Sequence, residues 1–185
     1  MPTNRTNSFH LFEQERERTN TMTAALNARL INIRKKNIAD SLSDFEGSSH
    51  KLEHVKSLNG VDFIDDSRST NTNAVWFALQ SMTKPAVWIT NIDEAENLTD
   101  DLLNVVREKV KCIVLQGVYN TEVYERLSAL DIPMCIEMNI DDAVREAYYS
   151  SKEGYVILFS PGVNGTAQVT YRERGNRFQK AVGQL

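Results

Sequence analysis

The sequence predicts one α/β domain built on a mainly parallel sheet, and two observations carry this prediction. Short apolar runs alternate with stretches of helical periodicity from residue 63 to residue 182. Runs such as Val87–Ile89 and Cys112–Leu115 are apolar at every position. A strand needs such a run when helices cover both faces of its sheet. A chain of 185 residues has room for one such domain and an appendage.

The first 46 residues precede this alternation. Residues 1–18 have a polar start, a small apolar patch and a closing charge run, so we expect a flexible arm. Apolar residues then recur at helical spacing, which predicts two short helices that end at Gly47. We therefore divide the chain into an arm (1–18), a helical segment (19–46) and a main domain (47–185).

The main domain is expected to begin with a hairpin. Val55–Leu58 and Val61–Ile64 are strand-like runs separated by Asn59-Gly60, a dipeptide that suits a type I′ turn. The alternation that follows predicts strands over 63–66, 85–90, 111–116, 134–137 and 155–160, and helices over 71–82, 98–109, 121–129, 140–151 and 169–182. Together these elements make a doubly wound, Rossmann-like sheet with an antiparallel hairpin and preceding helices.

Composition excludes several classes of function. The net charge of -4, with acids and bases interspersed, gives no basic stripe for a nucleic acid. The sequence has no run of about 20 apolar residues for a membrane span. Residues 1–10 are polar and lack the apolar centre of a signal peptide, so we expect a cytoplasmic protein. Cys112 and Cys135 lie in apolar runs, and we expect both to be reduced, buried thiols.

Two local patterns suggest chemistry that their context does not support. His50–His54 fits the H-x-x-E-H pattern of zinc proteases, but the segment runs into a strand, where the two histidines would lie about 13 Å apart. We predict no metal site there. Pro161–Thr166 has two glycines after a strand but no lysine, so we interpret it as a turn in which Thr166 caps the next helix. Phosphate binding by this loop is the alternative.

The polar segment Asp65–Asn71 leaves the carboxyl end of a predicted strand and opens a helix. Ligands of open α/β sheets bind at such positions. The alternative is that Thr70 or Asn71 only caps the helix while the acidic residues face solvent. The local pattern leaves both interpretations open.

Three separated motifs agree, in order, with those of one known family. His50–Glu53 is similar to H-R-L-E, and Asp65–Asn71 is similar to N-D-S-K-A-T-N. Ser160-Pro161 and Tyr171–Phe178 are similar to S-P and E-E-R-G-x-x-F. These motifs resemble the C-terminal domain of the Mur ligases, in particular the D-glutamate-adding enzymes of peptidoglycan synthesis. The resemblance covers 38–185 and, more weakly, 19–37.

The resemblance implies roles for five residues. ATP would contact Lys51 and Asp66, and the incoming amino acid would contact Arg68, Thr70 and Ser160. ATP is therefore the candidate cofactor. In the family, the phosphate loop and the magnesium ligands belong to another domain, and we find no such loop in these 185 residues. We accordingly assign no catalytic residue and no metal ligand, and we expect no ligation by this chain alone.

The chain also departs from the family pattern. The segment 90–95 stands where the family has G-G-x-D-K-G and brings acids in place of a lysine; the segment 160–167 loses a serine and a phenylalanine that line the amino-acid site. D-glutamate recognition is therefore not expected. Our leading hypothesis is a degenerate, non-catalytic domain that binds a protein partner or a second copy through the helices of 19–46. The alternatives are one part of a split ligase acting in trans, a nucleotide or anion sensor, and a gene remnant.

Overall fold

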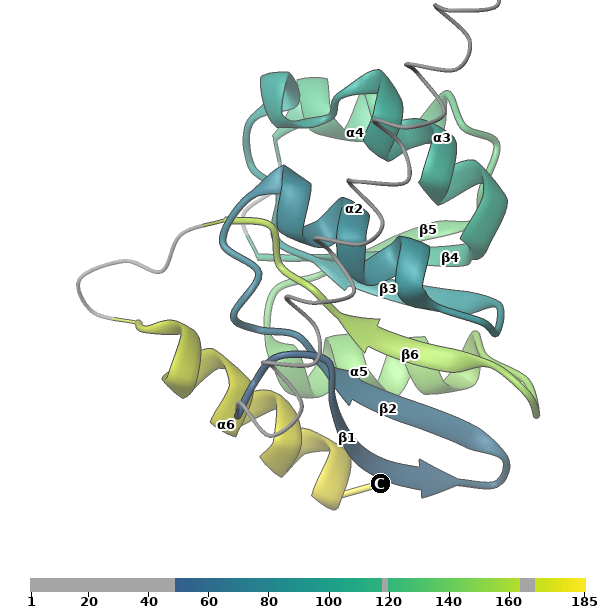
Figure 1. Ribbon diagram of the computed structural model, residues 1–185, viewed down its shortest axis with the longest axis vertical. Coiled ribbons are helices and arrows are strands. Elements are labelled where there is room, and N and C mark those ends of the chain that lie inside the picture. Colours follow the sequence, from purple (N-terminus) through teal and green to yellow (C-terminus); the bar gives the residue numbers. More distant parts are fainter. Residues whose placement is uncertain (1–48, 118–119, 164–168) are drawn as a thin grey trace, which may run out of the picture. The chain divides into compact units, whose positions relative to one another are not determined.

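The computed structural model describes residues 49–117, 120–163 and 169–185, which lie within one compact unit, Gly47–Leu185. The arm and helices expected over 1–46 lie outside the described residues, as does Thr166. The predicted fold class is confirmed, because a six-stranded, mainly parallel sheet lies between two layers of helices (Figure 1).

Strands and helices alternate along the described chain. The strands are β1 (Glu53–Leu58), β2 (Val61–Asp65), β3 (Ala86–Thr90), β4 (Val110–Gln116), β5 (Met134–Glu137) and β6 (Val156–Phe159). The helices are α2 (Thr72–Ser81), η1 (Ala95–Asn97, a short 3-10 helix), α3 (Asp100–Lys109), α4 (Thr121–Ser128), α5 (Ile140–Tyr149) and α6 (Tyr171–Gly183). Each strand and helix predicted over residues 55–182 has its counterpart, with ends that differ by a few residues.

The strand order is β1-β2-β6-β3-β4-β5. The hairpin between β1 and β2 is antiparallel, and its turn residues Asn59 and Gly60 have φ of 49° and 77°, as a type I′ turn requires. All other strand pairs are parallel. The last strand, β6, lies between β2 and β3, so the residues that follow β2 and β6 meet at one edge of the sheet.

The core has two apolar layers, one on each face of the sheet. Helices α2, α3 and α4 cover one face, where Trp88 is fully buried. Helices α5 and α6 cover the other, where Phe159 and Phe178 stack with ring centroids 5.0 Å apart. Every residue of β3 is buried, which is the condition that its unbroken apolar sequence predicted.

Side chains cap the two helices that flank the edge formed by β2 and β6. Asn71, one of the two predicted caps, accepts a hydrogen bond from the Ala74 amide at 3.0 Å and starts α2. Thr170, not Thr166, caps α6 by accepting from the Glu173 amide at 3.3 Å. The prediction for Thr166 was wrong because α6 begins only at Tyr171, and a cap must directly precede the first helical residue.

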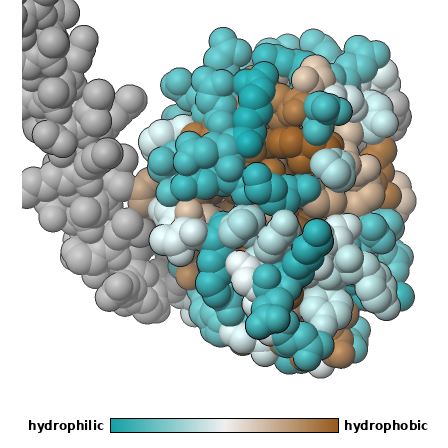
Figure 2. Space-filling model, turned by 90° about the vertical axis from the view of Figure 1, so that its right-hand side faces the viewer, coloured by the Kyte–Doolittle hydropathy of each residue, from teal (hydrophilic) through white to brown (hydrophobic). Residues whose placement is uncertain are grey.

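The cysteines and the surface complete the description. Both thiols are free; Cys112 is buried as predicted, whereas Cys135 is only partly buried. None of the helices in the described ranges is long and apolar enough to cross a membrane. Figure 2 shows a patch of hydrophobic residues surrounded by hydrophilic ones on the side of the molecule that lies to the right in Figure 1.

Candidate functional site

The predicted ligand-contacting residues lie at the carboxyl ends of the neighbouring strands β2 and β6. Asp65 pairs with Phe159, so the next residue of each strand, Asp66 and Ser160, emerges at the same level. Ser160 Oγ donates a hydrogen bond to Asp66 Oδ2 at 2.7 Å. The parallel pairing of two strands distant in sequence thus creates a direct contact between two predicted site residues.

Asp66 is almost fully buried, and its carboxylate accepts several hydrogen bonds. Ser69 Oγ also donates to Oδ2, and the Leu52 amide donates to Oδ1 at 3.3 Å. We call Leu52, Asp66, Ser69 and Ser160 the Asp66 cluster. Burial raises the pKa of Asp66 from 3.8 to about 6, while the hydrogen bonds from the two serines and Leu52 oppose that shift.

Lys51, Arg68 and Thr70 lie around this cluster. Partial burial lowers the pKa of Lys51, while the nearby Asp66 charge raises it and the Arg68 charge lowers it, which places these three groups within electrostatic reach. The Arg68 guanidinium carbon lies 5.7 Å from the centroid of the Tyr171 ring on α6. Thr70 is half-buried and immediately precedes the Asn71 cap. The five residues therefore gather at the ends of β2 and β6.

The arrangement differs from the roles predicted for these residues in one respect. Asp66 was expected to meet ATP and Ser160 to meet an amino acid, yet the two side chains bond to each other and both are buried. Both side chains therefore already have a partner within the protein. The individual binding roles remain predictions.

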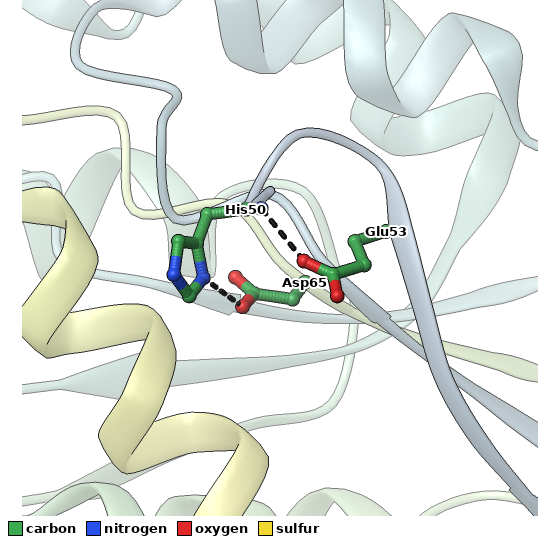
Figure 3. A group of neighbouring side chains, drawn as sticks. All are labelled: His50, Glu53 and Asp65. Atoms are coloured by element: carbon green, nitrogen blue, oxygen red, sulfur yellow. Dashed lines mark hydrogen bonds and ion pairs between the residues drawn. The ribbon is translucent and has the colours of Figure 1, made fainter. Parts of the chain in front are cut away.

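A second cluster lies on the other side of β2, and sequence reasoning missed it. His50 Nδ1 donates to Asp65 Oδ2 at 2.8 Å, and the His50 amide donates to Glu53 Oε2 at 2.7 Å (Figure 3). We call His50, Glu53 and Asp65 the His50 cluster. The available signal was the first half of the H-x-x-E-H pattern, together with an aspartate at the position of the family asparagine in N-D-S-K.

The second histidine of that pattern has other partners. His54 has 57% of its side chain exposed, and its Nε2 lies 3.0 Å from Ser57 Oγ and 3.7 Å from Asp62 Oδ1. His50 and His54 thus point to different partners, since each side chain meets a different aspartate.

Helix α6 holds the His50 cluster in place. A Cβ atom at Gly175 would lie only 2.1 Å from His50 Nδ1 and 2.5 Å from Ser67 Oγ, so the contact requires glycine. One turn further along, Gln179 Nε2 donates to Asp65 Oδ2 at 2.9 Å and approaches Glu53 Oε2 at 3.3 Å. The closing motif at 171–178 therefore serves to pack α6 against the start of the domain.

A cavity of about 500 Å³ lies near the carboxyl ends of β3 and β4 and beside α6. Arg174, Arg177 and Lys180 contribute positive charge to its wall. Arg174 already donates to the Val163 and Ser67 carbonyls, and Arg177 pairs with Glu173 at 2.6 Å. The two arginines thus have structural partners, which weakens the anion-sensor hypothesis.

Comparisons with known proteins agree with this geometry. The chain is 37% identical over 168 residues to a UDP-N-acetylmuramoylalanine–D-glutamate ligase from Bacteroides fragilis and 37% identical over 167 residues to the ligase of the same name from Christiangramia forsetii; each match covers 90% of this chain. The chain is thus homologous to a part of the D-glutamate-adding Mur ligases. It spans 38% of the length of both relatives. A scan against models of protein families finds no match.

Solved structures show the same fold at low sequence identity. A UDP-N-acetylmuramate-alanine ligase from Thermotoga maritima superimposes with a TM-score of 0.52 at 16% identity, covering 78% of this chain and 32% of that one. A second match is a domain from a Haemophilus ducreyi protein assigned as a UDP-N-acetylmuramate:L-alanyl-γ-D-glutamyl-diaminopimelate ligase. It superimposes with a TM-score of 0.50 at 13% identity, covering 71% of this chain and 98% of that one. The described unit thus shares its fold with a part of these ligases.

Proposed function

We propose that this Mur ligase domain is not catalytic by itself and acts by associating with a protein in cell-wall metabolism, in the cytoplasm. The observation that carries the proposal is the closed Asp66 cluster, in which the carboxylate expected to meet ATP is buried and bonded to Ser69 and Ser160. A carboxylate buried and bonded within the protein is less accessible to a ligand than an exposed one. The D-glutamate ligase names of the relatives support the assignment to cell-wall metabolism.

Charge at the neighbouring loop supports the same proposal. Asp93 and Glu94 follow β3 and are both exposed, in the segment where the resemblance has a lysine. Like charges close together disfavour the binding of an anionic substrate. The loop therefore presents acids where a D-glutamate site needs a cation.

The surface offers a route to association. Hydrophobic residues gather on one face of the described unit, bordered by hydrophilic ones (Figure 2). Contiguous apolar surface of this kind marks protein contacts more often than random exposure. The helices expected over 19–46 are a second candidate contact, and self-association through them is part of the proposal.

The experiment mixes this chain with a UDP-N-acetylmuramoylalanine–D-glutamate ligase from which the C-terminal domain has been removed. Light scattering after size exclusion measures complex formation, and the chain alone reports self-association. A complex, or a defined oligomer of the chain alone, without ATP-dependent amide formation supports the proposal. A monomer that does not bind the truncated ligase refutes it.

The alternative, a split ligase completed in trans, rests on the charged groups that remain around Asp66. Lys51, Asp66 and Arg68 stay within electrostatic reach of one another at the expected edge of the sheet. In the same mixture, restored ligation that is lost on Asp66→Ala would favour this alternative. Complex formation without restored ligation would count against it.

A further inference from the structure

We propose that His50, Glu53 and Asp65 form a binding site for one divalent transition-metal ion, with zinc as the first probe. This site is distinct from the Asp66 cluster and does not depend on the proposed function. It lies where the segment before β1 and the end of β2 meet α6 (Figure 3).

The geometry brings three suitable ligand atoms together. One atom from each of His50, Glu53 and Asp65 lies within 4.8 Å of the other two. Imidazole nitrogen and carboxylate oxygen are ligands that zinc and neighbouring transition metals accept. A tetrahedral ion at about 2.0 to 2.2 Å from each ligand holds the ligand atoms roughly 3.5 Å apart. The site therefore has to contract slightly, and the half-buried Glu53 has the most freedom to move.

Burial and charge favour a cation at this point. Asp65 is fully buried, and His50 is nearly so. The partners of the Asp65 carboxylate among the described residues are His50, the Ser67 amide and Gln179, and neither amide carries a charge. A buried carboxylate is stable when it is paired or when it coordinates a metal. A second carboxylate, that of Glu53, adds to the demand for positive charge.

Gln179 occupies the position that an ion would take. Its Nε2 lies 2.9 Å from Asp65 Oδ2, 3.3 Å from Glu53 Oε2 and 3.5 Å from His50 Nδ1. The amide thus acts as a neutral substitute for a cation: its N–H groups are directed at the two carboxylates, while His50 Nδ1 carries its own proton. An ion displaces Nε2 and the His50 ring proton, and rotation of the amide then offers Oε1 as a fourth ligand.

An unpaired hydroxyl provides a second, independent observation. Ser67 is fully buried, and its Oγ has no hydrogen-bond partner among the described residues. Ser67 Oγ and His50 Nδ1 would both crowd a Cβ placed at Gly175, so the hydroxyl and the ring nitrogen face the same point of α6. A buried polar atom without a partner is uncommon and points to a missing ligand, such as a metal-bound water.

The chain departs from its family at the residue that makes the site. Asp65 stands where the resemblance has the asparagine of N-D-S-K, and this single change supplies a second carboxylate beside the histidine. An ion held there would tie the segment before β1, the end of β2 and helix α6 together. Such an ion would stabilise the fold. This structural role is unrelated to the catalytic role of the metal in zinc proteases.

The test adds Zn²⁺ to the full chain after chelator treatment and measures binding by competition with a chromogenic chelator. We expect one equivalent to bind and to raise Tm by roughly 5 to 10 °C at a free concentration 100 times Kd. Asp65→Asn and Glu53→Gln should each weaken binding at least about tenfold. Both are isosteric changes, and circular dichroism confirms that each variant is folded before binding is measured.

Two controls make the result decisive. His54→Gln changes the exposed histidine of the same pattern and should leave binding unaltered. Co²⁺ in place of Zn²⁺ should give a spectrum without thiolate charge transfer, which excludes Cys112 and Cys135 as ligands. No binding by the wild-type chain, equal binding by Asp65→Asn, or a thiolate band would each overturn the proposal.

Discussion

Asp65 and Asp66 are consecutive, buried carboxylates, and each lies at the centre of one cluster. The two clusters offset the cost of removing a carboxylate from water in different ways. Asp66 meets the hydroxyls of Ser69 in its own loop and of Ser160 after β6, and the amide of Leu52 ahead of β1. Asp65 meets an imidazole and a glutamine from α6, with a second carboxylate close by. The Asp66 cluster is locally satisfied and closed, whereas the His50 cluster depends on α6 and retains capacity for a cation.

The largest expected effect tests the dependence of the His50 cluster on α6. Gly175→Ala places a methyl group 2.1 Å from His50 Nδ1, so α6 must move away or the ring must turn. We expect a loss of about 2 to 4 kcal/mol in the free energy of unfolding, measured by urea denaturation. Gly183→Ala, in the same helix with nothing within 4 Å, should change stability by less than about 1 kcal/mol. Equal effects would show that α6 does not hold the cluster.

The next effect concerns the charge on Asp66. The pKa of Asp66 is about 6 in the folded chain and 3.8 is its ordinary value, so the folded state binds more protons between these pH values. Stability therefore falls as pH rises through this window, and the full cost, about 3 kcal/mol at most, is present above pH 6. Asp66→Asn removes this cost.

We expect Asp66→Asn to stabilise the chain by about 1 to 3 kcal/mol at pH 8 and to give no gain at pH 4. Urea unfolding at pH 8, 6 and 4 measures the difference from the wild-type chain. A gain that persists at pH 4, or a loss at pH 8, would show that the carboxylate is not held at an energetic cost.

A smaller effect tests whether the serine hydroxyls satisfy the Asp66 carboxylate. Ser160→Ala removes the donor at 2.7 Å and should destabilise the chain by about 1 to 2 kcal/mol at pH 8. In the Asp66→Asn background the same change should have a smaller effect, because no charge is left to stabilise. Additive effects in this double-mutant cycle would mean that the two side chains do not interact.

The smallest effect comes from the exposed end of the same strand. Hydrogen bonds from Lys84 and then Ser57 lower the pKa of Asp62, so this carboxylate adds stability above its ordinary pKa and loses it as pH falls. Asp62→Asn should destabilise the chain by less than about 1 kcal/mol at pH 7, measured by thermal unfolding. The change in stability has the opposite sign to that of Asp66→Asn. The two variants therefore distinguish a carboxylate that burial makes costly from one that surface pairing stabilises.

The fold was predictable because its signals are local. Asn59-Gly60 specifies the hairpin turn by backbone conformation alone, and the all-apolar run of β3 announces a strand covered on both faces. Asp66, Arg68, Thr70 and Ser160 lie together because the ends of the parallel strands β2 and β6 meet, and the antiparallel hairpin brings Lys51, ahead of β1, to the same place. Their proximity is thus a property of the fold, and their binding roles stay predictions.

The orientation of the side chains was not predictable. Asp65 and Asp66 are adjacent, and a strand sends neighbours to opposite faces, but no local pattern says which face carries His50 and which carries Ser160. The His50 cluster needs Gly175 and Gln179 of α6, which lie more than a hundred residues away in sequence. The packing of α6 against the sheet decides which side chains meet, and the periodicity of the sequence does not reveal that packing.

The central position of β6 has a consequence for synthesis on the ribosome. Before residues 156–159 have been made, the hairpin and the β3-β4-β5 sheet have no shared partner strand. Each half exposes an unpaired edge during this time, and such edges are prone to aggregation. Translation must pass almost the whole domain before the two halves can pair with β6, so the order of synthesis delays completion of the sheet.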